Sequence, residues 1–346
     1  MSSDSRQGAD LVGAALSVSR ERPVFVTGGT GFVGSHLVEA LSARGYGQIR
    51  CLVRKNPGWL SEVDHTPVSG DLSGAASLTQ AMQGCGLVFH VAGRTRARSW
   101  EAFHEANVAG TINLLEAASS LDNPPRIQIV SSLAAVGRAS EPVATEATPL
   151  DPVSMYGRSK AEMEQALEPF RNRLDITVVR PPAVYGPRDT DIFTVIQGAS
   201  RGLFAVVGGS EGPALTLVHV RDLVRGMIDA AEAPLTKGRT YFLGADPAYA
   251  WTAVRDAAAT ALGRRVFTLR IPSGLIVPVG TLVEKVSGLF GHYPPLNREK
   301  ALEIRDACIM CSSDSAARDF GYNADTPLWD GFAEAVAWYR ERGWLK

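Results

Sequence analysis

The sequence has few of the residues that secreted and metal-dependent proteins concentrate. It holds four cysteines and six histidines in 346 residues. Four cysteines in a chain of this length do not make the disulfide framework of a small secreted protein. Cys308 and Cys311 have CxxC spacing, but a zinc site needs two more ligands and no second pair or histidine cluster follows. We interpret the pair as buried thiols in a strand and predict no metal site.

Neither sign of charge dominates. The chain has 35 basic and 36 acidic residues, for a formal net charge of −1. Nucleic-acid-binding proteins concentrate positive charge on one surface, and this sequence has no basic stripe with interleaved aromatic residues. The composition therefore argues against a nucleic acid as partner.

Long apolar runs are also missing. The nearest candidate, from Ile271 to Phe290, is interrupted by Glu284, Lys285, glycines and prolines, so we expect no membrane span. Residues 1–22 are polar and rich in small residues, and their one apolar run is short for a signal-peptide core. We interpret them as a mobile tail and expect a cytoplasmic protein.

A glycine-rich turn between an apolar strand and a helix organises what is present. Val24–Val26 lead into the turn, and residues 35–41 have helical apolar spacing. Bare backbone N–H groups and the positive end of a helix dipole bind a diphosphate, and glycine leaves no Cβ in the way. The spacing is GxxGxxG rather than the general GxGxxG, but strand, turn and helix in this order predict a dinucleotide site. The candidate contacts are Gly28, Thr30, Gly31, Phe32, Val33 and Gly34.

The end of the next strand favours NADP(H). The strand over residues 48–53 is followed by Arg54, where an NAD-binding protein usually has Asp or Glu. A carboxylate bonds the ribose 2′-OH and repels a 2′-phosphate, whereas a guanidinium pairs with phosphate. We predict NADP(H) over NAD(H); the alternative is that Arg54 is a solvated strand end.

Strands and helices alternate through the first half of the chain. We expect strands at 66–69, 86–93, 127–130 and 176–179, and helices at 75–82, 102–118 and 154–167. This alternation predicts an α/β fold with a Rossmann-type, doubly wound parallel sheet. Ligands bind at the carboxyl ends of such strands, where the glycine turn, Ala92-Gly93 and Ser131-Ser132 fall.

The pattern loosens after Arg180, where turn residues accumulate. We expect a dinucleotide-binding domain over residues 23–182, rejoined by about 214–245. A smaller, interleaved C-terminal substrate lobe would take 183–213 and 246–346. Its expected elements are helices at 251–262, 297–305 and 328–342 and a strand at 266–271, while the helix at 220–231 and strand at 240–243 rejoin the sheet.

Tyr156 and Lys160 form the second informative motif. Residues at i and i+4 share a helix face. A phenol, with a reference pKa of about 10, is a poor acid–base catalyst at neutral pH, and an ammonium one turn away lowers that pKa. Ser132, at a strand end, would hold a substrate oxygen by hydrogen bonding. Without the cofactor motif, an exposed Tyr and Lys on an amphipathic helix would be the better interpretation.

Taken together, these motifs resemble the extended short-chain dehydrogenase/reductase superfamily, also called the NAD-dependent epimerase/dehydratase family. The resemblance runs from about Pro23 to the end of the chain. It rests on Thr27–Gly34, Gly70-Asp71-Leu72, His90-Val91-Ala92-Gly93, Asn107, Ser131-Ser132, Tyr156 with Lys160, and Arg180–Pro187, in that order.

The resemblance implies roles for individual residues. Tyr156 would be the general acid in reduction and the base in oxidation, Lys160 would lower its pKa and bond the nicotinamide ribose, and Ser132 would polarise the substrate oxygen. Asn107 would be either a cofactor contact or a structural bond donor. The other implied cofactor contacts are Asp71, Leu72, Ala92, Gly93, Val130 and Pro181. A homodimer through the helices at 102–118 and 154–167 is implied by the family alone.

The substrate class follows from finer resemblances. Sugar-nucleotide enzymes of the family usually place Asn three residues after the arginine, where this chain has Ala183. The stretch 131–137 is closer to 3β-hydroxysteroid dehydrogenases, and Leu52-Val53-Arg54 is closer to dihydroflavonol-4-reductase-like enzymes. We therefore predict an NADP(H)-dependent carbonyl reductase or alcohol dehydrogenase acting on a hydrophobic ketone or secondary alcohol. The alternatives are a nucleotide-sugar 4-epimerase or dehydratase, and a non-catalytic NADP-binding sensor or scaffold.

Contacts to the substrate are less defined by the sequence. The candidates are Arg94, Leu133, Ala183 and Val184. Ile271–Pro278 and Leu289-Phe290 either line an apolar pocket or belong to the core. Arg94, Arg96, Arg98 and Arg188 border the predicted cleft, where they either hold an anionic substrate or face water. His90, in a buried strand, is interpreted as a core histidine.

Overall fold

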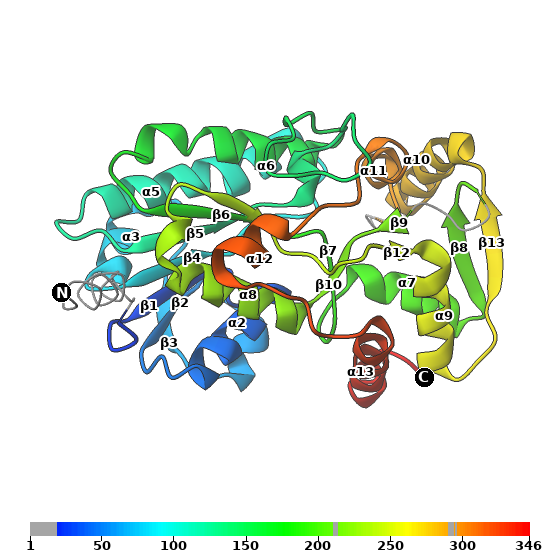
Figure 1. Ribbon diagram of the computed structural model, residues 1–346, viewed down its shortest axis with the longest axis horizontal. Coiled ribbons are helices and arrows are strands. Elements are labelled where there is room, and N and C mark those ends of the chain that lie inside the picture. Colours follow the sequence, from blue (N-terminus) through cyan, green and yellow to red (C-terminus); the bar gives the residue numbers. More distant parts are fainter. Residues whose placement is uncertain (1–18, 210–213, 290–293, 295) are drawn as a thin grey trace, which may run out of the picture.

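The computed structural model describes residues 19–209, 214–289, 294 and 296–346. Its centre is a seven-stranded parallel sheet with strand order β11-β6-β5-β4-β1-β2-β3 (Figure 1). The strands are β1 (Val24–Thr27), β2 (Ile49–Val53), β3 (Thr66–Ser69), β4 (Leu87–His90), β5 (Arg126–Val130), β6 (Ile176–Arg180) and β11 (Thr240–Phe242). Every residue of β1, β4 and β6 is buried, as expected for a parallel sheet covered on both faces. The chain order reverses between β1 and β4, which is where such sheets open a ligand crevice.

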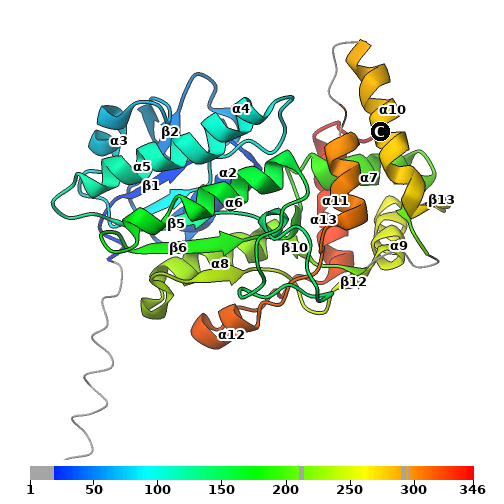
Figure 2. The same cartoon turned by 90° about the horizontal axis from the view of Figure 1, so that it is seen from above.

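Helices cover both faces of this sheet, which confirms the predicted fold class. The helices α2 (Phe32–Ala43) and α8 (Val220–Glu232) share one apolar core with the sheet. The helices α3 (Ala75–Met82), α5 (Gly110–Ser119) and α6 (Met155–Gln165) share the core on the opposite face. Figure 2 shows α5 and α6 on one side of β6, and α8 with α12 (Asp314–Phe320) on the other.

The lobe is a separate layer built around its own core. Its helices are α7 (Asp191–Ser200), α9 (Trp251–Leu262), α10 (Ser273–Leu289), α11 (Arg298–Asp306) and α13 (Leu328–Glu341). Three two-stranded sheets accompany them: β7 (Ala183–Tyr185) with β10 (Leu217–His219), β8 (Leu203–Val207) with β13 (Phe267–Ile271), and β9 (Ala214–Leu215) with β12 (Tyr249–Ala250). Buried residues of α7, α9 and α13 pack together with Phe204 and Tyr185. The side chains that define this core come from distant parts of the sequence.

Several sequence expectations change here. The helix α8 and strand β11 return to the main domain near the expected range, but β9 and β10 pair outside the seven-stranded sheet. Cys308–Cys311 is not a strand: only Cys311 forms an isolated bridge, to Ala144, because the segment follows an irregular loop. Cys311 is buried and Cys308 half-buried.

The last residues of the expected N-terminal tail contact the sheet domain. Of the expected tail, residues 1–18 lie outside the described residues, and Arg20 forms an ion pair with Glu232 of α8 at 3.0 Å. Within the described residues, no helix is both long and apolar enough to cross a membrane.

Candidate active site

The glycine turn forms a surface that admits no side chain. Gly28 has a φ of +76°, and a Cβ there would lie 2.5 Å from the Ala92 backbone nitrogen. A Cβ on Gly34 would lie 2.1 Å from the Gly28 carbonyl oxygen. Gly31 caps α2 without a side-chain hydrogen bond, so the first N–H groups of the helix, from Phe32 and Val33 onward, face outward as in an anion site. The turn therefore fits a diphosphate.

The rim next to this turn carries the residues predicted for the adenosine half of a cofactor. Arg54 is exposed just beyond β2, and Asp71 is exposed just beyond β3. The pKa of Asp71 is lowered, mainly by a hydrogen bond from the Ser73 hydroxyl and also by the charge of Arg54. Leu72 packs against Gly110, where a Cβ would lie 2.9 Å from Leu72 Cδ1. The guanidinium and the carboxylate therefore share one edge of the sheet.

Asn107 holds the loop that follows β4. It lies in a π-helical turn, His104–Ala109, between α4 (Trp100–Phe103) and α5, so the single helix expected at 102–118 is interrupted. Its Nδ2 donates to the Arg94 carbonyl (3.0 Å) and to Ser159 Oγ (2.8 Å), and its Oδ1 accepts from the Arg94 N–H (2.6 Å). These bonds are those of a structural bond donor. π-Helical turns are rare and recur at functional sites.

Ser132, Tyr156 and Lys160 converge at the carboxyl end of β5. Ser154 caps α6 by accepting from the Gly157 N–H at 3.0 Å, which places Tyr156 in the first turn of the helix. The side chain of Ser132 lies near that of Tyr156 and favours its ionised form. Lys160 is buried, and its Nζ donates to the Val130 carbonyl at 2.7 Å. The same ammonium lies beside the loop after β4, since a Cβ on Gly93 would be 3.2 Å from Nζ.

The ionisation of this pair differs from the expectation. Burial raises the pKa of Tyr156 to about 12. The Ser132 side chain lowers this pKa, and the charges of Glu303 and Asp191 raise it further. Burial also lowers the pKa of Lys160 to about 8, against the charge of Glu164. The lowering of the Tyr156 pKa that we expected from Lys160 is outweighed here by burial of the phenol, and the ammonium is bonded to the Val130 carbonyl, so the role of Lys160 stays a prediction.

A buried ion pair supports these residues from below. Glu164 accepts from Arg180 Nε (2.9 Å) and Nη2 (2.6 Å), and from Ser131 Oγ (2.5 Å). The three groups tie α6 to the ends of β5 and β6, and Pro181 is buried directly after that arginine. Sequence reasoning missed this pair, although Glu164 lies one turn after Lys160 on the same helix face.

His90 is a core histidine, as interpreted from the sequence. Its Nδ1 lies 2.7 Å from Thr27 Oγ1 and its Nε2 lies 2.9 Å from Thr111 Oγ1. The Thr111 hydroxyl donates to the Asn107 carbonyl at 2.7 Å, so the ring donates from Nε2 and accepts at Nδ1. Burial, with a further contribution from Lys160, lowers the pKa of His90 to about 3, which keeps the ring neutral.

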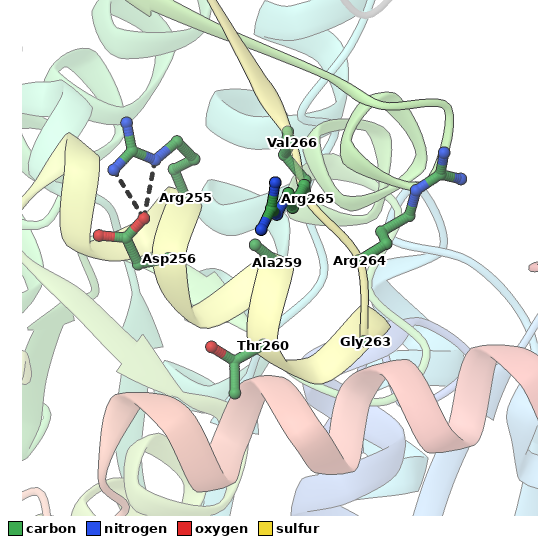
Figure 3. Close-up of a pocket in the computed structure, with 8 residues that line it drawn as sticks. All are labelled: Arg255, Asp256, Ala259, Thr260, Gly263, Arg264, Arg265 and Val266. Atoms are coloured by element: carbon green, nitrogen blue, oxygen red, sulfur yellow. Dashed lines mark hydrogen bonds and ion pairs between the residues drawn. The ribbon is translucent and has the colours of Figure 1, made fainter.

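The predicted substrate contacts occupy different environments. Arg94 and Ala183 are exposed, Val184 is half-buried on β7, and Leu133 is buried in the short 3₁₀ helix after Ser132. Phe290 lies outside the described residues, and Leu275 and Leu289 are exposed on α10 rather than in a pocket or core. The surface depression drawn in Figure 3 lies at the end of α9 and contains none of the predicted site residues.

Arg96 and Arg188, which were expected to border the cleft, are bound within the protein. Arg96 forms an ion pair with Asp191 at the start of α7. Arg188 is buried, with Nη1 donating to Ser35 Oγ (3.0 Å) and Nη2 to Glu39 Oε1 (2.6 Å). It therefore joins the lobe to α2 instead of facing either substrate or water.

The lobe is also hydrogen-bonded to the first turn of α6, the helix that carries Tyr156. Ser154 Oγ donates to Glu303 Oε1 and the Met155 N–H donates to Glu299 Oε2, both at 2.6 Å. Both carboxylates belong to α11, and negative charge at a helix N-terminus is favourable. We refer to this pair of contacts as the α11 clamp. These contacts could not be predicted from spacing in the sequence, because the partners are separated by 149 and 144 residues.

Comparisons with known proteins agree with this geometry. The model of the NAD dependent epimerase/dehydratase family matches residues 24–244. A ceramide reductase from Caulobacter vibrioides is 32% identical over 93% of this chain and 96% of its own. A 2-alkyl-3-oxoalkanoate reductase from Shewanella oneidensis is 26% identical over 97% of this chain and 90% of its own.

Solved structures share the fold. The structure of DesIV, a dTDP-glucose 4,6-dehydratase from Streptomyces venezuelae with NAD and TYD bound, superimposes with a TM-score of 0.73 at 25% identity. The match covers 94% of this chain and 99% of that protein.

Proposed function

Because the chain belongs to the NAD dependent epimerase/dehydratase family and is an NAD(P)-dependent oxidoreductase, we propose that it reduces a hydrophobic ketone, or oxidises the matching secondary alcohol, with NADP(H). One observation carries the proposal: Ser132 at the end of β5 and Tyr156 on α6 lie close enough for Ser132 to act on the ionisation of the phenol, and the buried Lys160 ammonium lies one helix turn farther along. The two relatives above are named as reductases of a ceramide and of a 2-alkyl-3-oxoalkanoate, which supports an apolar carbonyl substrate.

The residues present suit this chemistry. A nicotinamide cofactor, when bound, gives a hydride to the carbonyl carbon or takes one from the carbinol carbon. The Tyr156 hydroxyl gives its proton to the substrate oxygen in reduction, while Ser132 donates a hydrogen bond to the same oxygen. The Lys160 ammonium, which lies beside the loop after β4, would bond the nicotinamide ribose. Because the pKa of Tyr156 is raised to about 12, the phenol is protonated at neutral pH, which is the form that reduction requires.

The preference for NADP(H) rests on Arg54. Its exposed guanidinium stands beyond β2 with no carboxylate in that position, so it suits a 2′-phosphate. We expect a lower KM for NADPH than for NADH, and Arg54→Asp to reverse the ratio. Lys237→Asp, an exposed charge change on a different surface, serves as the control. A wild-type preference for NADH would disprove the NADP(H) assignment.

A substrate panel tests the reaction itself. Purified protein is incubated with NADPH and either apolar ketones or UDP- and dTDP-sugars, and NADPH oxidation and products are followed. Turnover of ketones is expected, since the exposed Ala183 offers no side-chain hydrogen bond to a sugar nucleotide. Turnover of sugar nucleotides alone would favour the epimerase or dehydratase alternative, and NADPH binding without any turnover would favour the sensor alternative.

The family-level expectations of a homodimer and a cytoplasmic location belong to this proposal. The dimer would form through α4, α5 and α6, as expected from the resemblance. Sedimentation equilibrium of the full chain tests it, and a single monomeric species at micromolar concentration would contradict it.

A further inference from the structure

We propose that the end of the lobe farthest from the seven-stranded sheet docks on a lipid bilayer that carries anionic headgroups. In the described residues, seven of the ten large hydrophobic side chains that are exposed gather on β8, β13 and α10. They are Leu203, Phe267, Leu269, Leu275, Leu282, Val286 and Leu289, which together we call the distal apolar surface. Scattered exposed hydrophobic residues need no explanation, whereas a contiguous group marks an interaction site.

The ribbon of β8 and β13 supplies one part of this surface. The strands are parallel, with Leu203 opposite Phe267 and Ala205 opposite Leu269. Phe204 and Val206 are buried in the lobe core, so the alternate residues of both strands point away from it. The outward face of the ribbon therefore carries only apolar side chains, and Phe267 is 69% exposed.

The helix α10 supplies the other part. Its buried positions, Ile276 and Gly280, face α11, since a Cβ on Gly280 would lie 2.8 Å from Ala301 Cβ. Leu282 and Leu289, on a different side of the helix, are 63% and 84% exposed. Only Pro272 separates β13 from α10, and Figures 1 and 2 show both elements at the end of the molecule away from the sheet.

Cationic side chains lie next to these apolar residues. The nearby cations are Arg201 before β8, Arg264 and Arg265 before β13, and Lys285 on α10. Figure 3 shows Arg255, Arg264 and Arg265 around the depression at the end of α9. Arg255 is engaged by Asp256, while Arg265 has no ion pair or hydrogen bond with the described residues.

The position of Arg265 relates this charge to the apolar face. Val266 packs against the lobe core, so Arg265 and Phe267 point to the other side, together with Leu269. The net charge of the whole chain is −1, which makes this a local concentration of positive charge beside exposed apolar side chains. Arginine stems lie along apolar surface while their guanidinium groups reach polar groups above it.

This combination suits a bilayer better than a second copy of the chain. A two-fold contact through this face would bring two copies of the same cationic patch into one interface, because such an interface uses the same patch on both subunits. Anionic headgroups are complementary to the cations, and the acyl region accepts the leucines and phenylalanine. Docking of this kind leaves the protein at the membrane surface, in keeping with the absence of a spanning helix in the described residues.

The location also relates the surface to the site. The helix α10 packs on α11, whose Glu299 and Glu303 hold the first turn of the Tyr156 helix. The inference rests here on the proposed function: a hydrophobic substrate dissolved in the bilayer would reach the protein at the lobe, whose helix α11 contacts the Tyr156 helix. Membrane binding is measured without turnover, so its failure is distinguishable from a failure of the catalytic proposal.

The test is vesicle flotation of the full-length protein. Vesicles of phosphatidylcholine alone are compared with vesicles that also contain phosphatidylglycerol, at low and high salt. Leu282→Ser tests the apolar contact and Arg265→Glu the charge. Leu235→Ser, at a leucine that is also 63% exposed but lies elsewhere, and Lys237→Glu are the matched controls.

We expect binding to the anionic vesicles that salt weakens, and a loss of about tenfold in affinity for Leu282→Ser, comparable with the removal of one buried leucine. Arg265→Glu should weaken binding to the anionic vesicles, and neither control should. The proposal is overturned if the wild type does not bind anionic vesicles at low salt, or if the controls lose as much binding as the surface variants. It is also overturned if Leu282→Ser dissociates a dimer instead of changing vesicle binding.

Discussion

The glycine turn and the helix α10 differ in how closely the rest of the protein packs around their residues. At Gly28 and Gly34 an added Cβ would meet backbone atoms within 2.5 Å, so the fold itself excludes every other residue. At Gly274 and Gly288 on α10 nothing lies within 4 Å, and leucines on the same helix face solvent. Packing inside the chain therefore explains the composition of the turn, while that of α10 must be explained by something the chain contacts.

The polar side chains of the two regions also differ in whether they have partners within the chain. In the sheet domain, His90 is bonded on both ring nitrogens and Glu164 holds both Arg180 and Ser131. On the outer side of the lobe, Arg265 has no partner among the described residues. Mutations at the bonded groups of the sheet domain should therefore cost activity or stability, whereas mutations on the exposed side of α10 should not.

Removal of the catalytic hydroxyl should have the largest effect. Tyr156→Phe takes away the proton donor, and we expect kcat to fall by about 10²–10⁴-fold with NADPH affinity little changed. Tyr249→Phe, a half-buried lobe tyrosine, is the control and should retain activity. Activity that survives Tyr156→Phe would show that another group transfers the proton.

Breaking the buried ion pair should come next. Glu164→Ala leaves Arg180 buried without its carboxylate, and we expect about 3–5 kcal/mol to be lost from the free energy of unfolding. Urea denaturation measures the loss. Glu162→Ala, in which the carboxylate belongs to an exposed i,i+4 pair with Arg158, should change stability by about 0.5 kcal/mol or less.

The two kinds of glycine should respond in opposite directions. Gly34→Ala forces a Cβ against the Gly28 carbonyl, and we expect a loss of about 1–3 kcal/mol in stability together with weaker NADPH binding. Gly274→Ala, in an open helical position, should raise stability by about 0.5–1 kcal/mol. Thermal unfolding and NADPH titration of both variants test this comparison. It is contradicted if both substitutions change the stability in the same direction.

The pH dependence of stability should show an effect that is confined to acid conditions. The pKa of His90 is lowered to about 3 in the folded protein, so the unfolded chain binds the extra proton first as the pH falls below about 6.5. Stability from this group is therefore fully present above that pH and declines below it, by about 2 kcal/mol at pH 5. His90→Gln should show a shallower loss than wild type between pH 7 and pH 5; equal slopes would mean that the pKa of His90 is the same in the folded and the unfolded chain.

Local patterns were sufficient to predict the sheet domain. The helix at Ala75–Met82 and the parallel sheet around the glycine turn follow from apolar spacing and turn chemistry, which act over a few residues. Tyr156 and Lys160 were predicted together because one helix turn separates them. The sequence also identified Ser132, which the strand β5 brings to the same place.

The remaining features depend on contacts between distant residues. The pairing of β8 with β13 joins residues more than sixty positions apart, and the α11 clamp spans a still larger separation. The helix α10 was read as a pocket or core segment because its apolar residues are numerous, and their exposure is a property of the assembled lobe. The raised pKa of Tyr156 likewise results from burial, which helical spacing does not report.

The α11 clamp has a consequence for synthesis of the chain. Ser154 and Met155 belong to the middle of the sequence, but their bonding partners, Glu303 and Glu299, are translated last among the elements around Tyr156. A ribosome-bound fragment that ends before α11 contains the entire glycine turn together with Ser132, Tyr156 and Lys160, yet the first turn of its tyrosine helix has only the Ser154 cap and lacks both carboxylates. Nascent chains should therefore acquire nucleotide affinity well before they acquire turnover.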